Sequence, residues 1–400
     1  MDNVLGSFIL YNEIQVQSPT RKRTSDAVLE PIHSATRPRL DALAATTTKD
    51  LDDVTDPPRE PVWYKQTKVA NTRGPRSGAA NYSSAIDLKL SALRAAISYC
   101  EDTASRGRGQ ALDEADLAKV ATGLHEAFFI EFGKEVAAKA AIRKNRMLHN
   151  DGGLPRLFHD AWLQSHKITY PLYIIADAKE LYTKWWRGIF DTSLYRGIAI
   201  GKKKNTKIDR AGSANRLEPG YEGRLDGKFF GNKHLLNGQW WPHQLCALRD
   251  GAHNSAQAGI AGDREEGAWS VILGGDPRYP DIDNDDEVQY CGTAAAEDAT
   301  EPTTATQYMK RSVEVGHPVR VIRSENCKNA ELRPKKGYRY DGLYKVVDEE
   351  LIDIKKQLWR FKMQRLPGQD PIRATGAGER PTQQELDKLQ LSKVERAFLA

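Results

Sequence analysis

The segment from Gly274 to Cys291 contains the side chains best suited to binding a flat ligand. Tyr279 and Tyr290 each offer an aromatic face, and the carboxylate of Asp281 can accept hydrogen bonds from an amino group. Taken alone, Tyr290 is more typical of ordinary strand packing. The residue types alone therefore leave open whether these side chains contact a ligand or pack within a sheet, and for Tyr290 they favour packing.

An acidic run lies between the two tyrosines. A calcium-binding loop that began at Asp281 would need glycine at its sixth position and glutamate at its twelfth. This chain has Asp286 and Gly292 there, so the spacing excludes an EF-hand. Apart from Asp281, the run is interpreted as a solvated loop; its members are Asp281, Asp283, Asp285, Asp286 and Glu287.

Short apolar runs around this segment predict β-strands, because they are separated by Gly, Pro, Asn and Asp and several alternate apolar with polar residues. Many short strands with few helices predict a curved, barrel-like sheet. A flexible break is expected at 375–378 and a charged helix at 382–398. The predicted strands are Ala268–Leu273, Pro318–Arg323, Gly342–Val347 and Leu358–Met363.

A helical period precedes the predicted strands. Its first helix carries apolar residues at i, i+4, i+7 and i+11, namely Ile86, Leu90, Leu93 and Ile97. Ser84 and Asp87 are placed like a capping box at its start. Further helices are expected over 113–146 and 175–186, which makes 84–195 a helical region of unknown function. Its tryptophans are interpreted as core rather than as a partner surface; they are Trp162, Trp185 and Trp186.

The composition of the 400 residues fits one or two domains with a disordered part, because only 40% are apolar. Residues 1–83 are predicted to be disordered and 196–214 to be a basic linker. The basic run at Thr20–Arg23 could serve nuclear import or simply be solvated, and the run at Gly201–Lys207 could be a second import signal or an arm that contacts phosphates. The net charge of +5 permits nucleic-acid binding without requiring it.

The four cysteines form no C-x-x-C pair, which argues against a zinc module or a disulfide framework and favours a reducing compartment. The start of the chain lacks the basic region of a signal peptide, and no stretch approaches the roughly 18 apolar residues that a membrane span needs. A soluble intracellular protein without membrane partners is expected.

Four motifs occur in a fixed order in the second half, and here the chain resembles the SRA (SET- and RING-associated) family, of the stand-alone fungal type. The family is also called YDG after a tripeptide that stands here at Tyr340–Gly342. The resemblance implies an α+β protein whose curved, barrel-like (PUA-like) SRA domain spans 215–373. The flexible break and the C-terminal helix then occupy 374–400. The motifs are Gln257–Gly262, Gly267–Gly275, Tyr279–Asp283 leading to Tyr290–Gly292, and Gly316–Arg323 leading to Tyr340–Val347.

The resemblance also implies binding of duplex DNA with 5-methylcytosine rotated into a pocket. Tyr279 and Tyr290 match the two tyrosines that sandwich the base, where stacking is worth roughly 1–3 kcal/mol. Asp281 matches the acceptor for the N4 amino group. The remaining base edge is expected to face the main-chain N–H of Cys291, and carbonyls at Gly274 and Gly275 are expected to line the pocket.

Further DNA contacts follow from the same resemblance. Gln257 matches the loop residue that fills the gap left by the rotated base. Asp341 is expected to be a turn former rather than a base reader. Basic residues near the pocket are candidates for neutralising phosphates; they are Arg264, Arg320, Arg323, Lys328, Arg333, Lys335 and Lys336.

Three departures from the family pattern limit what it implies. Two extra residues separate Gly275 from the acidic run, which affects the placement of Tyr279. Cys291 replaces a residue that usually carries a hydroxyl. Residues 293–306 lack the Asn-Lys-Arg finger by which some members examine the opposite strand. A preference for hemimethylated DNA is therefore not implied.

No catalytic motif accompanies the resemblance. The chain has no cysteine-rich SET segment, no RING spacing and no glycine-rich phosphate loop, and His125–Phe129 lacks the second histidine of a zinc protease site. We expect a nuclear binding protein without catalytic residue, metal or cofactor, with methylated DNA as its partner and chromatin proteins as further partners of 84–195. The alternatives are a modification-dependent nuclease with a dispersed site and a degenerate SRA fold used for protein interaction.

Overall fold

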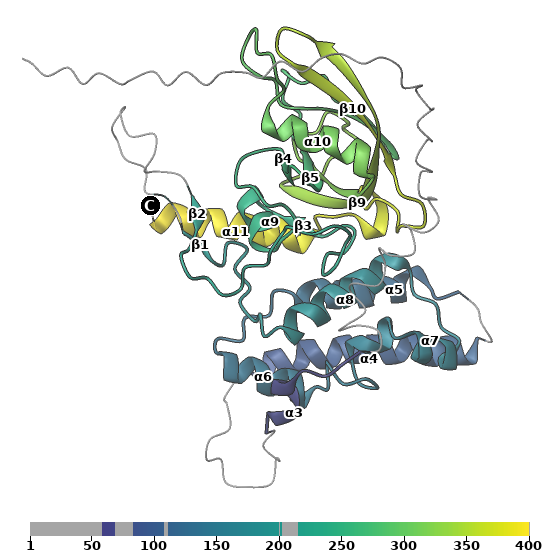
Figure 1. Cartoon of the computed structure of the whole chain (residues 1–400). Coiled ribbons are helices and arrows are strands. Elements are labelled where there is room, and N and C mark those ends of the chain that lie inside the picture. The colour runs from purple at the N-terminus through teal and green to yellow at the C-terminus, as the bar shows by residue number, and fades with distance from the viewer. Residues whose placement is uncertain (1–57, 69–82, 108–110, 200, 202–214, 400) are drawn as a thin grey trace, which may run out of the picture. The chain divides into compact units, whose positions relative to one another are not determined.

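The computed structural model describes residues 58–68, 83–107, 111–199, 201 and 215–399. The basic run at Thr20–Arg23 and most of that at Gly201–Lys207 lie outside these residues. Within them the chain forms a helical part followed by a large sheet with few helices (Figure 1). The predicted α+β class is thereby confirmed. No helix in the described ranges combines the length and apolar character that crossing a membrane requires.

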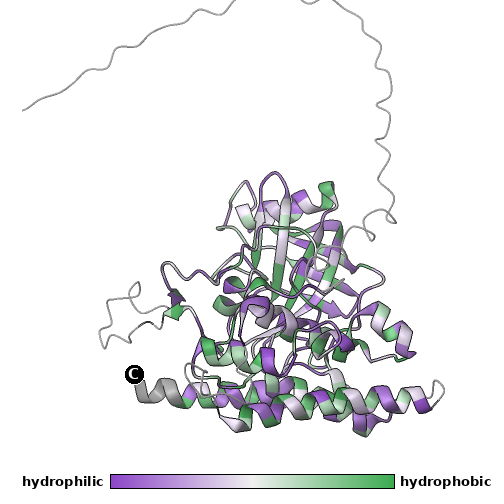
Figure 2. Cartoon of the chain, turned by 90° about the horizontal axis from the view of Figure 1, so that it is seen from below, coloured by the Kyte–Doolittle hydropathy of each residue, from purple (hydrophilic) through white to green (hydrophobic). Residues whose placement is uncertain are grey.

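The helical part has a core built from the faces that the apolar period predicts. Its helices are α3 (Val62–Gln66), α4 (Ser84–Arg106), α5 (Glu114–Ala127), α6 (Glu135–Lys144), η2 (Leu154–Leu157), α7 (Asp160–His166) and α8 (Leu172–Trp186). Apolar and polar residues alternate along the helices in Figure 2, as expected where one face is buried. On α4 the buried face includes all four predicted positions, Ile86, Leu90, Leu93 and Ile97.

Several local predictions for this part are wrong. The cap of α4 is Ser83, whose side chain accepts a hydrogen bond from the N–H of Ala85, one residue before the predicted Ser84. The single helix expected over 113–146 is two helices, with Gly133 at φ +76° in the break between them. Helix α3 lies inside the segment predicted to be disordered, because Tyr64 anchors it in the core.

Only one of the three tryptophans is fully in the core. Trp185 is 1% exposed, as the core interpretation requires. Trp162 and Trp186 are half-buried, and each donates its indole N–H within the chain, Trp162 to the carboxylate of Glu101 and Trp186 to the carbonyl of Arg59. Their polar edges are therefore already engaged.

The large sheet runs in the order β4-β5-β8-β9-β10-β7-β6, with β3 paired to β9. All neighbours are antiparallel except β5 and β8. Its end strands β4 and β6 do not pair with each other in the described part of the chain, so the barrel-like sheet stays open. The strands are β3 (Trp240–Trp241), β4 (Ile260–Asp263), β5 (Gly267–Leu273), β6 (Ile282–Asn284), β7 (Glu287–Cys291), β8 (Pro318–Ser324), β9 (Tyr338–Asp353) and β10 (Leu358–Arg365).

Register shifts bend the sheet at four places, between Ala261 and Gly262 in β4, within β8, and twice in β10. Helix α10 (Thr304–Val315) covers one face through the buried Met309, which belongs to the same apolar core as Tyr290. Sequence reasoning had no helix there. The remaining elements are β1 (Ile198–Ala199), β2 (Arg216–Leu217), α9 (Gln244–Arg249), η3 (Gly376–Gly378) and α11 (Gln383–Leu399).

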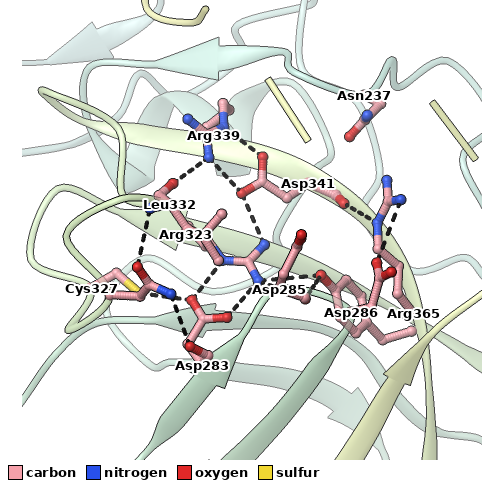
Figure 3. A network of polar contacts seen from close by, with 12 residues as sticks. Asn237, Asp283, Asp285, Asp286, Arg323, Cys327, Leu332, Arg339, Asp341 and Arg365 are labelled. Carbon is pink, nitrogen blue, oxygen red and sulfur yellow. Dashed lines mark hydrogen bonds and ion pairs between the residues drawn. The ribbon is translucent and has the colours of Figure 1, made fainter. Parts of the chain in front are cut away.

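A buried network of charged groups links three strands (Figure 3). Arg323 on β8 donates to Asp283 on β6 at 2.7 Å and to Asp341 on β9 at 3.1 Å. Arg339 donates to the other oxygen of Asp341 at 2.6 Å. Two predictions are corrected here: Asp341 is a buried strand residue rather than a turn former, and Asp283 is 9% exposed rather than part of a solvated loop.

The break predicted at 375–378 lies between two anchored arginines. Arg373 and Arg380 both donate to the buried carboxylate of Asp177 on α8, at 2.6 and 2.9 Å. Although burial alone would raise it, these two guanidinium groups hold the pKa of Asp177 well below its usual range. The segment between the sheet and α11 is thus tied to the helical part by buried ion pairs.

Removing the shared carboxylate of the buried network should destabilise the sheet strongly. In Asp341→Ala, two buried guanidinium groups lose their common partner, so the free energy of unfolding should fall by about 3–5 kcal/mol. Urea denaturation of the full chain measures this. The control is Asp286→Ala, whose side chain is 78% exposed and lies 3.9 Å from its cation; an equal loss in both variants would contradict the role of the network.

Candidate functional site

The centre of the candidate site is a hydrogen bond between Asp281 and Cys291. Because β6 and β7 pair antiparallel, with Ile282 opposite Gln289, the residue before β6 lies beside the end of β7. The N–H of Cys291 donates to Oδ1 of Asp281 at 2.7 Å. Burial raises the pKa of Asp281, and the Cys291 hydrogen bond opposes that rise only in part. The two predicted base-reading groups are therefore together, bonded to each other.

Tyr290 forms the buried side of this site. It is 5% exposed, and its hydroxyl donates to the carbonyl of Gly259 at 3.2 Å. Burial raises the pKa of Tyr290 well above its ordinary value, and Asp281, Cys291 and Tyr279 are near enough to raise it further. Tyr290 thus belongs to the sheet core and to the candidate site at once.

Tyr279 is half-buried on the loop before β6. Its carbonyl accepts a hydrogen bond from Nζ of Lys328 at 2.6 Å, and the guanidinium of Arg278 lies 5.7 Å from the centre of its ring. One predicted phosphate ligand therefore holds the backbone of one predicted stacking residue. Whether the two tyrosine rings enclose a base stays a prediction.

The two glycines differ in what they do. Gly275 has φ +69°, and a Cβ atom there would lie 1.6 Å from the carbonyl oxygen of Asn326, so the fold requires glycine. At Gly274 an added Cβ would meet no atom within 4 Å. Packing within the free protein therefore gives no reason for glycine at 274, and the space beside it is open to a ligand.

Gln257 is exposed on a loop that a buried histidine holds in place. His253 bonds through Nε2 to the carbonyl of Ala258 at 2.8 Å and through Nδ1 to the hydroxyl of Ser270 at 2.8 Å. Burial lowers the pKa of His253 to about 4, so the ring is neutral at pH 7, with Nε2 as its donor. Sequence reasoning missed His253, since a lone histidine carries no signal of its partners.

Two of the predicted phosphate ligands are corrected by their burial. Arg320 is fully buried and donates to backbone carbonyls, including Ala252 at 3.1 Å and Gly227 at 2.7 Å. Arg323 is fully buried in the charged network described above. Neither guanidinium can reach a phosphate without breaking the fold.

The remaining phosphate candidates are exposed. Lys335 pairs with Glu379 at 2.9 Å and Lys336 with Glu325 at 3.2 Å. Exposed pairs of this kind are worth about 0–1 kcal/mol, so a phosphate can replace the carboxylate at little cost. The exposed candidates are Arg264, Lys328, Arg333, Lys335 and Lys336.

Arg360 is a further residue of the site that sequence reasoning missed. It lies on β10 directly opposite Cys291. Its Nε atom is buried without an acceptor among the described residues, and its nearest carboxylate, Glu350, is 3.8 Å away. The alternation of β10 predicts a face for Arg360, but only the strand register shows that this position faces Cys291.

The segment after Cys291 lies beside the turn between β9 and β10. The N–H groups of Ala295 and Asp298 donate to the carbonyls of Lys356 and Lys355, at 2.7 and 2.8 Å. The two lysines therefore lie beside the segment that lacks the Asn-Lys-Arg finger of some family members. In the described ranges, no three His, Cys, Asp or Glu side chains gather in a way that could hold a metal ion.

A family model described as the SAD/SRA domain matches residues 229–369. The chain carries an SRA domain. This confirms the family resemblance. The matched range covers the sheet and the candidate site, starts later than the predicted residue 215, and leaves the helical region unmatched.

Curated relatives share the SRA part of the chain. A "UHRF1-like protein" of Cryptococcus neoformans var. grubii is 38% identical over 128 residues, which are 27% of this chain and 36% of the relative. "E3 ubiquitin-protein ligase ORTHRUS 2" of Arabidopsis thaliana is 33% identical, over 29% of this chain and 20% of the relative. The chain thus spans little more than a third, or less, of the relatives it matches.

Solved structures include SRA domains with DNA. The chain is similar to the SUVH5 SRA domain in its complex with hemimethylated CG DNA, with 30% identity over 37% of this chain and 97% of that one, and a TM-score of 0.30.

The two glycines of the SRA domain should respond differently to substitution. Gly275→Ala forces a methyl group into the Asn326 carbonyl at a positive φ and should lower the free energy of unfolding by several kcal/mol, on the order of 3. Gly274→Ala should stay within about 0.5 kcal/mol of the unchanged protein. Thermal unfolding of both variants tests this, and equal losses would show that the space beside Gly274 is not open.

Proposed function

We propose that the SRA domain binds DNA containing 5-methylcytosine by accepting the modified base, rotated out of the duplex, between Tyr279 and Tyr290. The observation that carries the proposal is the pairing of the Asp281 carboxylate with the Cys291 N–H beside both tyrosines. The N4 amino group of cytosine calls for a carboxylate acceptor, and the N–H of Cys291 holds the Asp281 carboxylate in position.

Asp281 can accept a hydrogen bond from a base through one carboxylate oxygen while the other oxygen keeps its bond to the protein. Oδ1 is engaged by the N–H of Cys291. Oδ2 remains to accept from the N4 amino group, and the neighbouring thiol of Cys291 is only a weak hydrogen-bond donor. The base therefore replaces weak interactions of Oδ2 while the hydrogen bond to Oδ1 keeps the carboxylate oriented.

Arg360 supplies a donor on the other side of Cys291. A base or its phosphate that entered beside Cys291 would give the buried Nε an acceptor that the free protein lacks. Lys355 and Lys356 on the nearby turn, with the exposed candidates above, add positive charge for the DNA backbone.

We limit the proposed activity to DNA binding. Several relatives are named ubiquitin ligases, but the chain covers only a fifth of one such relative. Binding of methylated DNA would place this protein in the nucleus, where residues 84–195 could contact chromatin proteins. Neither alternative class gains a specific supporting observation from the site.

Replacing Asp281 with asparagine should abolish the preference for methylcytosine. With its oxygen on the Cys291 N–H, the asparagine turns amide donors toward the base, which oppose the N4 amino group and suit the O4 acceptor of thymine. We expect a loss of about ten-fold or more for the methylated duplex and a shift toward a G·T mismatch. Fluorescence anisotropy of the full chain at one fixed salt concentration measures the methylated, the unmethylated and the G·T-mismatched duplex.

The unchanged protein should bind a duplex with one methylated CpG more tightly than its unmethylated twin. Equal affinities would favour a degenerate SRA fold used for protein interaction. Cleavage of methylated plasmid in the presence of magnesium would instead support the nuclease alternative and contradict a pure binding role.

The substitution Asp281→Asn should not destabilise the fold at neutral pH. Because the pKa of Asp281 is raised in the folded protein, the folded state binds the proton more tightly than the unfolded state. Stability contributed by this group is therefore lost as pH rises from the unfolded value near 3.9 through the raised folded pKa. Urea titrations at several pH values should show Asp281→Asn gaining on the unchanged protein across that window, and a constant difference would refute the pKa assignment.

Arg360→Gln should weaken binding of the methylated duplex by about ten-fold, since it removes a charge-assisted hydrogen bond. The matched control is Lys362→Gln, two residues along the same face of β10 and paired with Glu287 at 2.9 Å. It removes the same charge farther from Cys291 and should change affinity no more than about two-fold. Equal effects of the two variants would reduce Arg360 to a general contribution of charge.

A further inference from the structure

A cavity lies at the carboxyl end of α8, away from the candidate base site. Side chains of α8, of the segment that follows it, of β3 and of α9 line this cavity. Its charged and aromatic lining includes Lys184, Arg187, Arg196, Trp240, Trp241 and Asp250.

The acidic groups of the cavity are already engaged by other cations. Asp250 accepts from Arg196 at 2.9 Å and from Arg249 at 2.6 Å. Glu180 accepts from Arg380 at 3.0 Å, and Glu385 pairs with the same guanidinium. Asp250 also acts on Arg187, and Glu180 on Lys184, but each of the three carboxylates is already in direct contact with another cation.

Two cations of the lining have no carboxylate partner. The guanidinium of Arg187 makes no hydrogen bond or ion pair with any residue in the described ranges. Nζ of Lys184 donates to the carbonyl of Phe128 at 3.0 Å. In addition, Nε of Arg196 and the hydroxyl of Thr183 are buried without partners among the described residues. The cavity thus holds more donors than acceptors.

This excess of positive charge is unfavourable in the free protein. Burial, together with the charges of Arg196 and Arg249, lowers the pKa of Lys184 to about 7, although Glu180 and Asp191 oppose this shift. Burial also lowers the pKa of Arg187. The carbonyls at the end of α8 would not repel an anion strongly, because those of Thr183, Lys184 and Trp185 each accept a backbone hydrogen bond.

We propose that this cavity binds a small oxyanion of the phosphate type. A tetrahedral oxyanion offers several acceptor oxygens, which suit the separate donors of Arg187, Lys184 and the Nε of Arg196. Its charge offsets the two cations that lack carboxylate partners. The site is independent of the base pocket and does not depend on DNA binding by the SRA domain.

Isothermal titration of the full chain with inorganic phosphate, in chloride buffer of matched ionic strength and without DNA, tests the proposal. The unchanged protein should bind one phosphate. Arg187→Gln should bind it about ten-fold more weakly, since one charge-assisted donor is lost, whereas Arg187→Lys should be intermediate. The control Arg311→Gln removes the same charge from α10, where the arginine pairs with Glu314 at 2.7 Å, and should bind phosphate normally.

Absence of phosphate binding by the unchanged protein would overturn the proposal, as would equal affinities of the unchanged protein and Arg187→Gln. Circular dichroism checks the fold of each variant. If Arg187→Gln does not fold, Arg187→Lys decides alone: an unchanged phosphate affinity there, where the forked donor is missing, contradicts the site.

Discussion

The buried pairing of Arg323 with Asp283 and Asp341 is the interaction on which the candidate site depends. It ties β8 to β6 and to β9, three strands that are not all neighbours in the sheet. Asp281 precedes Asp283 by two residues, so the anchoring of Asp283 also restricts where Asp281 can lie. Burying charged groups is costly unless each has a well-placed partner. If one of these three strands were displaced, a buried charge would lose its partner, so the three positions depend on one another.

Local pattern was enough to predict β5, β8, β10 and part of β9, because their runs are apolar and bounded by turn residues, but it did not predict β6 and β7, whose acidic run was interpreted as a solvated loop. It was also enough to bring Asp281, Tyr290 and Cys291 into one hypothesis through the family motifs. Local pattern wrongly predicted Arg320 and Arg323 to be exposed phosphate ligands, because an arginine in a strand is expected to be exposed unless its partner is known. Those partners, the carbonyl of Ala252 and the carboxylate of Asp283, are 68 and 40 residues away in the sequence.

The same limit explains the other misses. Helix α3 contains few residues and holds its place through the contact of Tyr64 with a distant core, which no local period records. Arg360 became visible only through strand register. Conversely, Gly274 and Gly275 look alike in sequence, yet only the position of the Asn326 carbonyl distinguishes a glycine that the fold requires from one that it does not.

The ion pairs of Arg373 and Arg380 with Asp177 bear on how this protein can be divided. The matched family range ends at residue 369, just before these arginines, although their carboxylate partner lies in α8. A fragment that ended at residue 369 would contain Asp177 without Arg373 and Arg380. The range that the family model matches is therefore shorter than the part of the chain that these buried ion pairs hold together, and a fragment designed from the match alone would separate Asp177 from its arginine partners.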